Sequence, residues 1–194
     1  MSVNLGIDCA TRAIMKFRKG ILALAVAALF AACEVSDEFA PKQRTQIETY
    51  LTRNKLEYTI TSDSAYVHLA GNKYLGADEM RSEGATRDSR VSFNFEAYTF
   101  SSSPATTPYY TNKREVAEKL TDLNTLYWNF EPRVATLGRG DILNPLEEAL
   151  EGSLRGDSLA VFMTSSIAYG ESGMGTVPAN TAVMFVLIVE DVEK

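Results

Sequence analysis

The sequence contains few of the side chains on which metal and nucleophilic chemistry depend. It has one histidine, His68, and two cysteines, Cys9 and Cys33, among 194 residues. A single histidine excludes a zinc site built on two histidines, and a Ser-His-Asp triad would have to use His68. The residues therefore predict no metal site and no bound cofactor.

Positive charge is also scarce. The chain has 19 Lys and Arg residues against 25 Asp and Glu residues, which gives a formal net charge of −6. Because nucleic-acid binding relies on positive charge, this balance argues against nucleic acid as a partner. Hydrophobic residues make up 45% of the chain, which suffices for a core and excludes wholesale disorder. The length suits one domain with additional segments.

One long apolar run, Ile21–Ala32, follows a short basic cluster at Met15–Lys19. A transmembrane helix needs about 20 apolar residues, so this run is too short to span a membrane. A basic start, a short apolar stretch and small residues are typical of a secretory signal peptide, which we predict for residues 1–32. Residues 1–14 are interpreted as an upstream mis-start, because the acidic Asp8 is untypical of a signal peptide. The alternative is a buried core helix that ends in a cysteine.

The residues Phe30-Ala31-Ala32-Cys33 resemble a bacterial lipobox. This resemblance implies that Cys33 is acylated and becomes the first mature residue, with residues 33–43 as a lipidated tether. It predicts a protein of the Gram-negative cell envelope that is anchored by lipid to the outer membrane, on the periplasmic or the surface face. The acidic stretch Glu34–Phe39 resembles a surface-export tag; the alternative is a solvated tether.

Hydrophobic periodicity predicts a strand-rich domain after the tether. Residues Arg90–Phe100 alternate, with Val91, Phe93, Phe95 and Ala97 on one face, as in a half-buried strand. The other predicted elements are helices at 44–54 and 113–123, a loop at 101–108, and strands at 56–60, 65–69, 134–137, 158–164 and 181–192.

Asn144-Pro145 predicts the start of a further helix. Asparagine at the N-cap accepts hydrogen bonds from the first free N–H groups, and proline fits the first helical position. An apolar stripe then leads to a predicted end at Gly156; it consists of Leu146, Ala149, Leu150 and Leu154. A strand-rich chain with one well-marked helix indicates an α+β fold, in which an antiparallel sheet packs on the helix.

Several separated motifs occur in order toward the C-terminus. They are Leu137-Gly138, Ile142-Leu143, Leu146–Leu150, Ala168-Tyr169-Gly170, Gly173, Gly175, Val177–Ala182 and Phe185. Together they resemble an FKBP-type peptidyl-prolyl cis-trans isomerase, most densely over Leu137–Val192. The resemblance implies an FKBP-like twisted antiparallel sheet wrapped around a short α-helix. It places the FKBP-like domain at 90–194, after an N-terminal helical extension at 44–89.

The resemblance also implies roles for individual residues. Tyr169 would be the donor that bonds a ligand carbonyl, and Phe185 would line an apolar pocket; these are the two predicted catalytic residues. Leu146 stands where the family usually has a tryptophan at the pocket floor, and Phe95 stands where it has a tyrosine. The remaining predicted pocket residues are Ile142 and Leu143 at the entrance, and Val177.

The sequence also departs from the family. An insertion at about 101–132 precedes Leu137-Gly138, and the Phe-Asp pair that lines the family's pocket has no obvious equivalent. Tyr110-Thr111 is the nearest candidate, and it has no carboxylate. The insertion holds several aromatic residues, which are predicted either to pack on the domain or to face a partner: Tyr109, Tyr110, Tyr127, Trp128 and Phe130.

Three functions are compatible with these features. The first is a lipid-anchored prolyl isomerase that acts on proline-containing polypeptides of the envelope. The second is a catalytically degenerate FKBP-like binding or chaperone subunit of an envelope complex, docked through residues 101–132. The third, a hydrolase that pairs Glu147 with Glu148, is disfavoured because adjacent helical residues do not face each other. We predict the first function and keep the second as the alternative.

Overall fold

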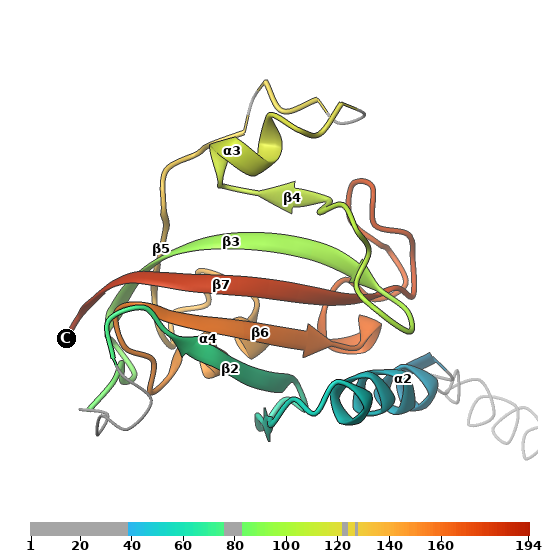
Figure 1. Cartoon of the computed structure of the whole chain (residues 1–194), viewed down its shortest axis with the longest axis horizontal. Helices are drawn as coiled ribbons and strands as arrows, with labels where there is room; N and C mark the ends of the chain where they lie inside the picture. The colour runs from blue at the N-terminus through green and yellow to red at the C-terminus, as the bar shows by residue number, and fades with distance from the viewer. Residues whose placement is uncertain (1–38, 76–82, 122–123, 127) are drawn as a thin grey trace, which may run out of the picture. The chain divides into compact units, whose positions relative to one another are not determined.

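A twisted antiparallel sheet forms the body of the protein (Figure 1). The structure is a computed structural model that describes residues 39–75, 83–121, 124–126 and 128–194. These residues belong to one compact unit, Glu38–Lys194. The predicted signal peptide and the predicted lipidation residue Cys33 lie outside the described residues. Within the described part, no helix has the length and apolar character needed to cross a membrane.

The sheet has seven strands in the order β1-β2-β6-β7-β3-β4, and β5 pairs with the start of β3. All pairings are antiparallel, and β3 and β7 pair from Arg90–Glu193 to Phe100–Ala182. The strands are β1 (Thr59–Ile60), β2 (Tyr66–Asn72), β3 (Arg90–Phe100), β4 (Tyr110–Thr111), β5 (Arg133–Thr136), β6 (Asp157–Met163) and β7 (Ala182–Glu193). The helices of the described part of the chain are α2 (Phe39–Arg53), α3 (Arg114–Ala117), α4 (Asn144–Leu150) and the 3-10 helix η1 (Ser165–Ile167).

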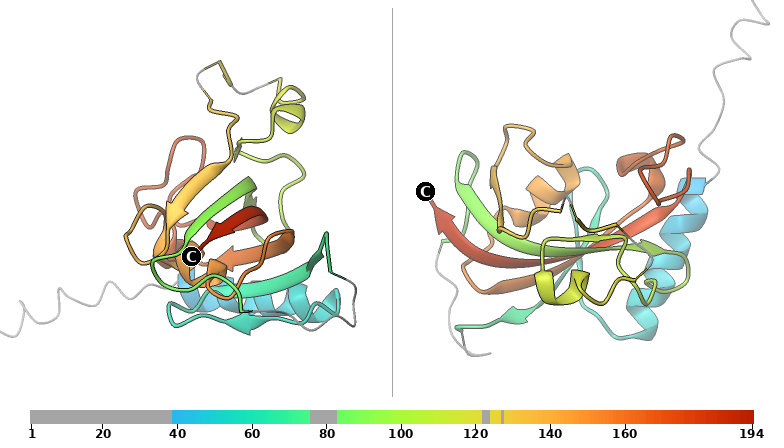
Figure 2. Two further views of the ribbon diagram at one scale, coloured as in Figure 1. Left: turned by 90° about the vertical axis from the view of Figure 1, so that its left-hand side faces the viewer. Right: turned by 90° about the horizontal axis from the view of Figure 1, so that it is seen from above.

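Alternation along the strands divides the core into two layers. One face of the sheet packs with α4, and its cluster includes Phe93, Leu150 and Phe185. The opposite face packs with α2, which crosses the sheet near one end (Figure 2) and buries Ile47 against residues such as Phe162. The predicted α+β class is therefore confirmed, as is the alternating strand at Arg90–Phe100.

The helix α2 is longer than its apolar periodicity indicated. It begins at Phe39 instead of Arg44, so residues 39–43 of the predicted tether are helical. Its first turns are held because Ala40 and Gln43 are buried as well as Ile47. By contrast, the helix predicted at 113–123 is the short α3.

The start of α4 differs from the prediction by one residue. Leu143, not Asn144, is the N-cap, and its carbonyl accepts from Leu146 and Glu147. Asn144 does not cap the helix because its side-chain amide donates to the Asp63 carboxylate, 2.5 Å away in the β1–β2 turn. A contact between residues far apart in sequence thus replaces the local cap.

The end of α4 also comes earlier than predicted. The helix stops at Leu150. Leu154, which was predicted to belong to its apolar stripe, therefore lies outside the helix, and Gly156 does not end it. The chain leaves the helix because the Gly152 N–H donates to the Ala85 carbonyl at 2.7 Å, and Gly152 takes a positive φ of 77°. Glycine adopts this conformation without steric cost.

Candidate functional site

Tyr169 lies in the long turn between η1 and β7. The Gly170 N–H donates to the Ser165 carbonyl at 2.7 Å, and the Asn180 N–H donates to the Gly170 carbonyl at 2.9 Å. Within the turn, Gly173 has a φ of +63°, and a Cβ there would lie 2.5 Å from the Val177 carbonyl oxygen. Only glycine fits this close approach. The turn that presents Tyr169 is therefore fixed by its own backbone.

Four aromatic rings contact one another in a row that starts at Tyr169 and continues through Tyr109 and Phe185 to Phe95. We call these four residues the aromatic cluster. The Tyr109 and Tyr169 hydroxyl oxygens are 3.0 Å apart. The Tyr109 ring stands nearly perpendicular to Phe185, with centroids 6.4 Å apart, and Phe95 lies 6.2 Å from Phe185. Edge-to-face contacts at such distances are favourable for aromatic rings. The cluster joins β3, β7 and two loops.

Burial keeps both tyrosines of the cluster protonated. It raises the pKa of Tyr109, and the hydrogen bond with Tyr169 raises that pKa further. Burial also raises the pKa of Tyr169, although its hydrogen bond with Tyr109 acts in the opposite direction. Both hydroxyls consequently remain neutral donors at physiological pH, since the ordinary tyrosine pKa is about 10.

The structure places all the predicted catalytic and pocket residues in or against one hydrophobic core cluster. Buried members of the α4-facing core are Phe95, Leu146, Val177 and Phe185, and partly buried side chains packed against it are Ile142, Leu143 and Tyr169. Phe185 is only 6% exposed. This core therefore supplies an apolar environment next to the Tyr169 hydroxyl.

A cavity of about 370 Å³ opens beside Tyr169. Of the predicted site residues, Tyr169 is the one that lines it. Asn124 and Trp128 of the insertion also line it, as does the tip of the turn after Tyr169, Met174–Thr176. The complete lining is Tyr109, Tyr110, Asn124, Trp128, Tyr169, Met174, Gly175 and Thr176.

Tyr109 is a site residue whose role the sequence did not reveal. The nearest equivalent of the family's aromatic-acidic pair was expected at Tyr110-Thr111. Tyr110 does line the cavity, but Thr111 is fully buried and its hydroxyl donates to the Phe95 carbonyl at 2.6 Å. The pair that faces the site is Tyr109-Tyr110. The sequence did not show this, because the length of the insertion leaves open which residues align with the family's aromatic-acidic pair.

Asn112 fastens the insertion to the sheet. Its side-chain oxygen accepts from the Phe95 N–H at 2.7 Å, and its side-chain nitrogen donates to the Glu131 carbonyl at 3.0 Å. Nearby, burial alone would raise the pKa of Glu96, but hydrogen bonds from Tyr98 and Lys113 outweigh it and lower that pKa. Asn112 thus ties both ends of the insertion to β3, close to the aromatic cluster: it bonds Phe95 directly and holds Glu131.

Glu147 holds the turn that precedes α4. Its carboxylate is 3% exposed, and it accepts from the N–H groups of Gly138, Gly140 and Asp141 at 2.8, 2.9 and 3.1 Å. This turn leads directly into Ile142 and Leu143. Its neighbour Glu148 instead accepts from Ser62 and Asp63. The two carboxylates have separate structural partners, which argues against a paired hydrolytic role.

Gln43 connects α2 to the turn that carries Tyr169. Its side chain is buried, its amide nitrogen donates to the Asn180 carbonyl at 2.8 Å, and its amide oxygen accepts from the Ser165 N–H at 2.7 Å. Ser165 and Asn180 are also the two residues that form backbone hydrogen bonds with Gly170, next to Tyr169. One helical side chain therefore braces both ends of the turn.

Replacing Gln43 with alanine is expected to lower the free energy of unfolding by about 2 kcal/mol, because a buried N–H and a partly buried carbonyl lose their partner. Thermal unfolding of Q43A measures this loss. The matched control is T45A on the same helix, where the exposed hydroxyl bonds only the Pro41 carbonyl. Equal midpoints for Q43A and T45A would contradict the bracing role.

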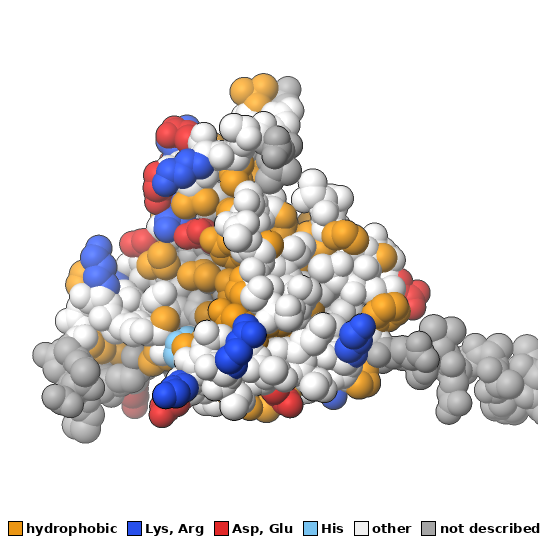
Figure 3. Space-filling model, turned by 45° about the vertical axis from the view of Figure 1, so that its right-hand side comes forward, with side chains coloured by type: hydrophobic (Ala, Val, Ile, Leu, Met, Phe, Trp, Pro, Cys, Tyr) orange, Lys and Arg blue, Asp and Glu red, His pale blue; other side chains and the backbone are white. Residues whose placement is uncertain are grey.

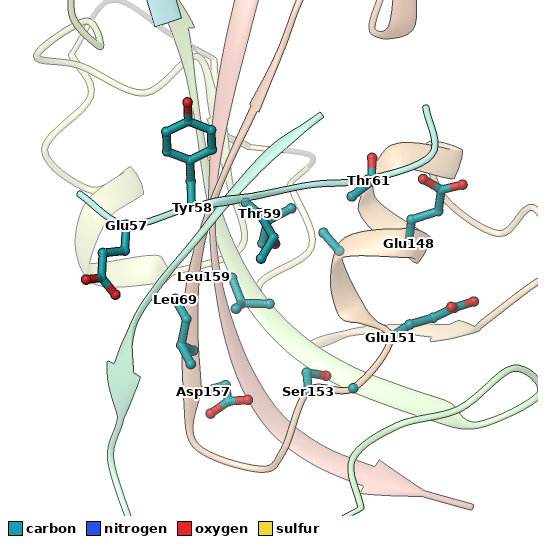
Figure 4. A pocket seen from close by; sticks show the side chains of 13 residues that line it. Glu57, Tyr58, Thr59, Thr61, Leu69, Glu148, Glu151, Ser153, Asp157 and Leu159 are labelled. Atoms are coloured by element: carbon teal, nitrogen blue, oxygen red, sulfur yellow. The ribbon is translucent and has the colours of Figure 1, made fainter. Parts of the chain in front are cut away.

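A larger cavity, of about 500 Å³, lies between the β1–β2 hairpin and the end of α4 (Figure 4). Its lining includes Glu57, Glu148 and Glu151, but none of the predicted site residues. Among the described residues, no group of three or more histidine, cysteine, aspartate or glutamate side chains is arranged to hold a metal ion. The cavity beside Tyr169 is the better candidate site, because Tyr109 and Tyr169 of the aromatic cluster line it.

The sequence matches the family of FKBP-type peptidyl-prolyl cis-trans isomerases over residues 82–189, which is more than half of the chain. This protein belongs to that family. A comparison with curated proteins gives no match.

Two solved structures share the fold. FkpA from Escherichia coli is 14% identical, with a TM-score of 0.50 over 99% of this chain and 75% of its own. A peptidyl-prolyl cis-trans isomerase from Pseudomonas syringae pv. tomato is 13% identical, with a TM-score of 0.50 over 79% of this chain and 95% of its own. At these identities the likeness establishes the FKBP-like fold alone.

Proposed function

We propose that this protein is a peptidyl-prolyl cis-trans isomerase that assists the folding of proline-containing polypeptides in the cell envelope. The observation that carries the proposal is the Tyr169 hydroxyl, a neutral donor that lies at a cavity and beside buried aromatic rings. Membership of the isomerase family supports it. Tyr169 and Phe185 are the proposed catalytic residues.

The proposed chemistry needs no nucleophile. Rotation about an X–Pro bond is slow because twisting destroys amide resonance, with a barrier of about 18–20 kcal/mol. The twisted amide carries less charge separation than the planar one, so an apolar environment favours the twisted state. In this site Tyr109 and Tyr110 line the cavity beside Tyr169, and Phe185 packs behind Tyr109 in the buried core. The hydroxyls of Tyr109 and Tyr169 share one hydrogen bond, in which either can be the donor. When Tyr109 donates, the Tyr169 hydrogen is left for the ligand carbonyl. Tyr109 then acts as a positioning residue.

We further propose that Cys33 carries a lipid that anchors the protein to the outer membrane. The lipobox-like sequence and the preceding basic and apolar stretches support this location. The helix α2 begins at Phe39, so only a few residues separate the proposed lipid from the folded unit. The isomerase would then work close to the membrane surface.

The direct test is an isomerisation assay with residues 34–194, which contain the whole compact unit. Proline peptides with varied preceding residues serve as substrates, and near-UV circular dichroism verifies that the sample is folded. Acceleration that falls in Y169F supports the proposal. No acceleration of any peptide by a folded sample would reject it.

The activity is expected to be independent of pH between about 6 and 9. Burial raises the pKa of Tyr169, so the donor keeps its proton throughout this range and is lost only at more alkaline pH. The measurement is kcat/KM across the range in buffers of constant ionic strength. A decline within this range would contradict this expectation and show that a titratable group other than Tyr169 controls the activity.

A non-catalytic binding or chaperone subunit remains the second candidate. Two observations favour it: the Tyr169 hydroxyl already has Tyr109 as a partner, and Tyr110 stands where a carboxylate was sought. Such a protein would bind proline peptides without accelerating their isomerisation. Isothermal titration with the peptides of the isomerisation assay separates the two functions.

A further inference from the structure

The cavity between the β1–β2 hairpin and the end of α4 is separate from the Tyr169 site. Its volume is about 500 Å³. None of the residues that line it belongs to the insertion or to the lining of the cavity beside Tyr169. The hydrophobic side chains that gather between the projecting insertion and the body of the protein (Figure 3) are thus a different surface.

The cavity has an apolar floor. The helix α4 has only seven residues and ends at Leu150, so it leaves the outer part of this sheet face uncovered. Leu69 in β2 and Leu159 in β6 line the cavity there, and Leu69 is 41% exposed. Val67 and Ala149 also belong to the apolar lining. An aliphatic chain placed on this floor would bury apolar surface.

Negative charge surrounds the apolar floor. Four of the lining residues are acidic, and none is basic. Figure 4 shows Glu57 on one side of the cavity and Glu148 and Glu151 on the other, with Leu69 and Leu159 between them. Such an arrangement attracts positive charge. Because no three acidic side chains of the described residues are grouped to hold a metal ion, an organic cation is the ligand that fits.

Ser153 supplies an independent indication that the cavity takes a ligand. The residue lines the cavity and is only 3% exposed. Of the described residues, it is the one whose buried side-chain hydroxyl has no hydrogen-bond partner. A buried polar group without a partner destabilises the fold, so native structures rarely retain one. A ligand that donates a hydrogen bond to Ser153 Oγ would satisfy this atom.

A primary ammonium group at the end of an alkyl chain matches these features. The chain would pack along Leu69 and Leu159, as the stems of lysine side chains do on apolar surfaces. The ammonium has three N–H groups, which would donate to Ser153 Oγ and to the Glu151 carboxylate. A guanidinium fits less well, because it prefers both oxygens of one carboxylate. Both oxygens of Glu148 already accept hydrogen bonds from the β1–β2 turn.

The edge of the sheet beside the cavity favours a polypeptide as the ligand. Thr59 of β1 lines the cavity, and β1 is the outermost strand, whose outer edge pairs with no other strand of the described residues. An extended peptide adds to such an edge through main-chain hydrogen bonds. A lysine of that peptide would enter the cavity, and its apolar neighbours would cover the exposed part of Leu69.

We propose that this cavity binds a lysine side chain from an extended, apolar segment of a partner polypeptide; we call it the lysine site. Ser153 Oγ and the Glu151 carboxylate contact the ammonium, and Leu69 and Leu159 contact the stem. The inference goes beyond the proposed function, because it assigns a second binding site that isomerisation does not use. It does not depend on catalysis of X–Pro rotation.

A nuclear magnetic resonance titration of residues 34–194 tests the lysine site, because it measures affinity and location together. The probe is a capped pentapeptide with one lysine between apolar residues and no proline. The matched peptide carries N-acetyl-lysine, which keeps the stem and loses the charge. The lysine peptide is expected to bind about tenfold more tightly, to shift the amides of residues 151–153, and to bind less tightly as salt is added. Equal affinities, no binding to a folded sample, or shifts confined to the turn around Tyr169 would overturn the proposal.

Substitutions in the lysine site identify the contacts. S153A is expected to weaken binding of the lysine peptide about tenfold, and E151Q about threefold. S153A should not lower the midpoint of thermal unfolding, because the hydroxyl that it removes has no partner. E118Q removes the same charge as E151Q from an exposed residue outside the cavity, and it should leave the affinity unchanged. Wild-type affinity in both S153A and E151Q would overturn the site.

A titration with n-butylammonium distinguishes the two sources of an ammonium group, because this ion is the end of a lysine side chain without a peptide. Binding much weaker than that of the lysine peptide supports a polypeptide ligand. Equal affinity with the same amide shifts would overturn the polypeptide and identify a free amine as the ligand. These results are independent of the isomerase, because the probes lack proline; a failed isomerisation assay would leave the lysine site intact.

Discussion

Replacing Phe185 with alanine is expected to lower kcat/KM by about 100-fold, which corresponds to roughly 2.7 kcal/mol of transition-state stabilisation. The ring is buried beside Tyr109 and Phe95, so its loss removes the apolar support of Tyr109, which lines the cavity where the twisted amide is proposed to lie. Burial of one phenylalanine side chain contributes about 1.5–3 kcal/mol, which sets this magnitude. The measurement is kcat/KM at about 10 °C, where uncatalysed isomerisation takes minutes and interferes little.

Phe185 also belongs to the core, so a matched loss of stability must be separated from the loss of catalysis. F162A removes the same ring from the neighbouring strand, but Phe162 faces α2 on the opposite side of the sheet. Both variants are expected to lose about 3–5 kcal/mol of stability. Only F185A should lose activity while folded. F185L, which keeps most of the volume, provides a second test if F185A fails to fold.

Equal activity of F185A, F185L and F162A at a temperature where all three are folded would remove Phe185 from the catalytic site. The apolar environment would then have to come from Tyr109 and Tyr110, which line the cavity directly. The single-site Y109F and Y169F variants would show which hydroxyl matters.

Local patterns predicted some elements well because local physics decides them. In the strand Arg90–Phe100 apolar and polar residues alternate, and buried and partly buried positions alternate with them from Val91 to Ala97, so its predicted bounds agree with the structure. The α4 cap was mispredicted because Asn144 finds a partner, Asp63, from a distant turn. A local capping preference is overridden when a tertiary contact uses the same side chain.

The candidate site was predicted only in part for the same reason. Motifs close together in sequence placed Tyr169 and Phe185 correctly in one neighbourhood. Tyr109 was not predicted as their partner, because its contact with Tyr169 spans 60 residues and an insertion of unknown register. Gln43 was missed because its bond to Ser165 spans 122 residues. The proposed lipid anchor and envelope location remain predictions from the sequence.

Replacing Glu147 with glutamine is expected to lower the free energy of unfolding by about 3 kcal/mol, because it turns an –NH₂ group toward buried N–H donors. The carboxylate accepts from three backbone groups, and glutamine keeps its size but only one acceptor oxygen. For a chain of this length the midpoint of thermal unfolding should fall by about 6–12 °C. Differential scanning calorimetry measures it.

The matched control for this change is E151Q, on an exposed residue that directly follows α4. Its stability should stay within about 0.5 kcal/mol of wild type. The turn that Glu147 holds leads into Ile142 and Leu143, so E147Q should also raise KM more than it lowers kcat at a temperature where it is folded. Equal unfolding midpoints for E147Q and E151Q would show that the turn before α4 is held by its backbone alone.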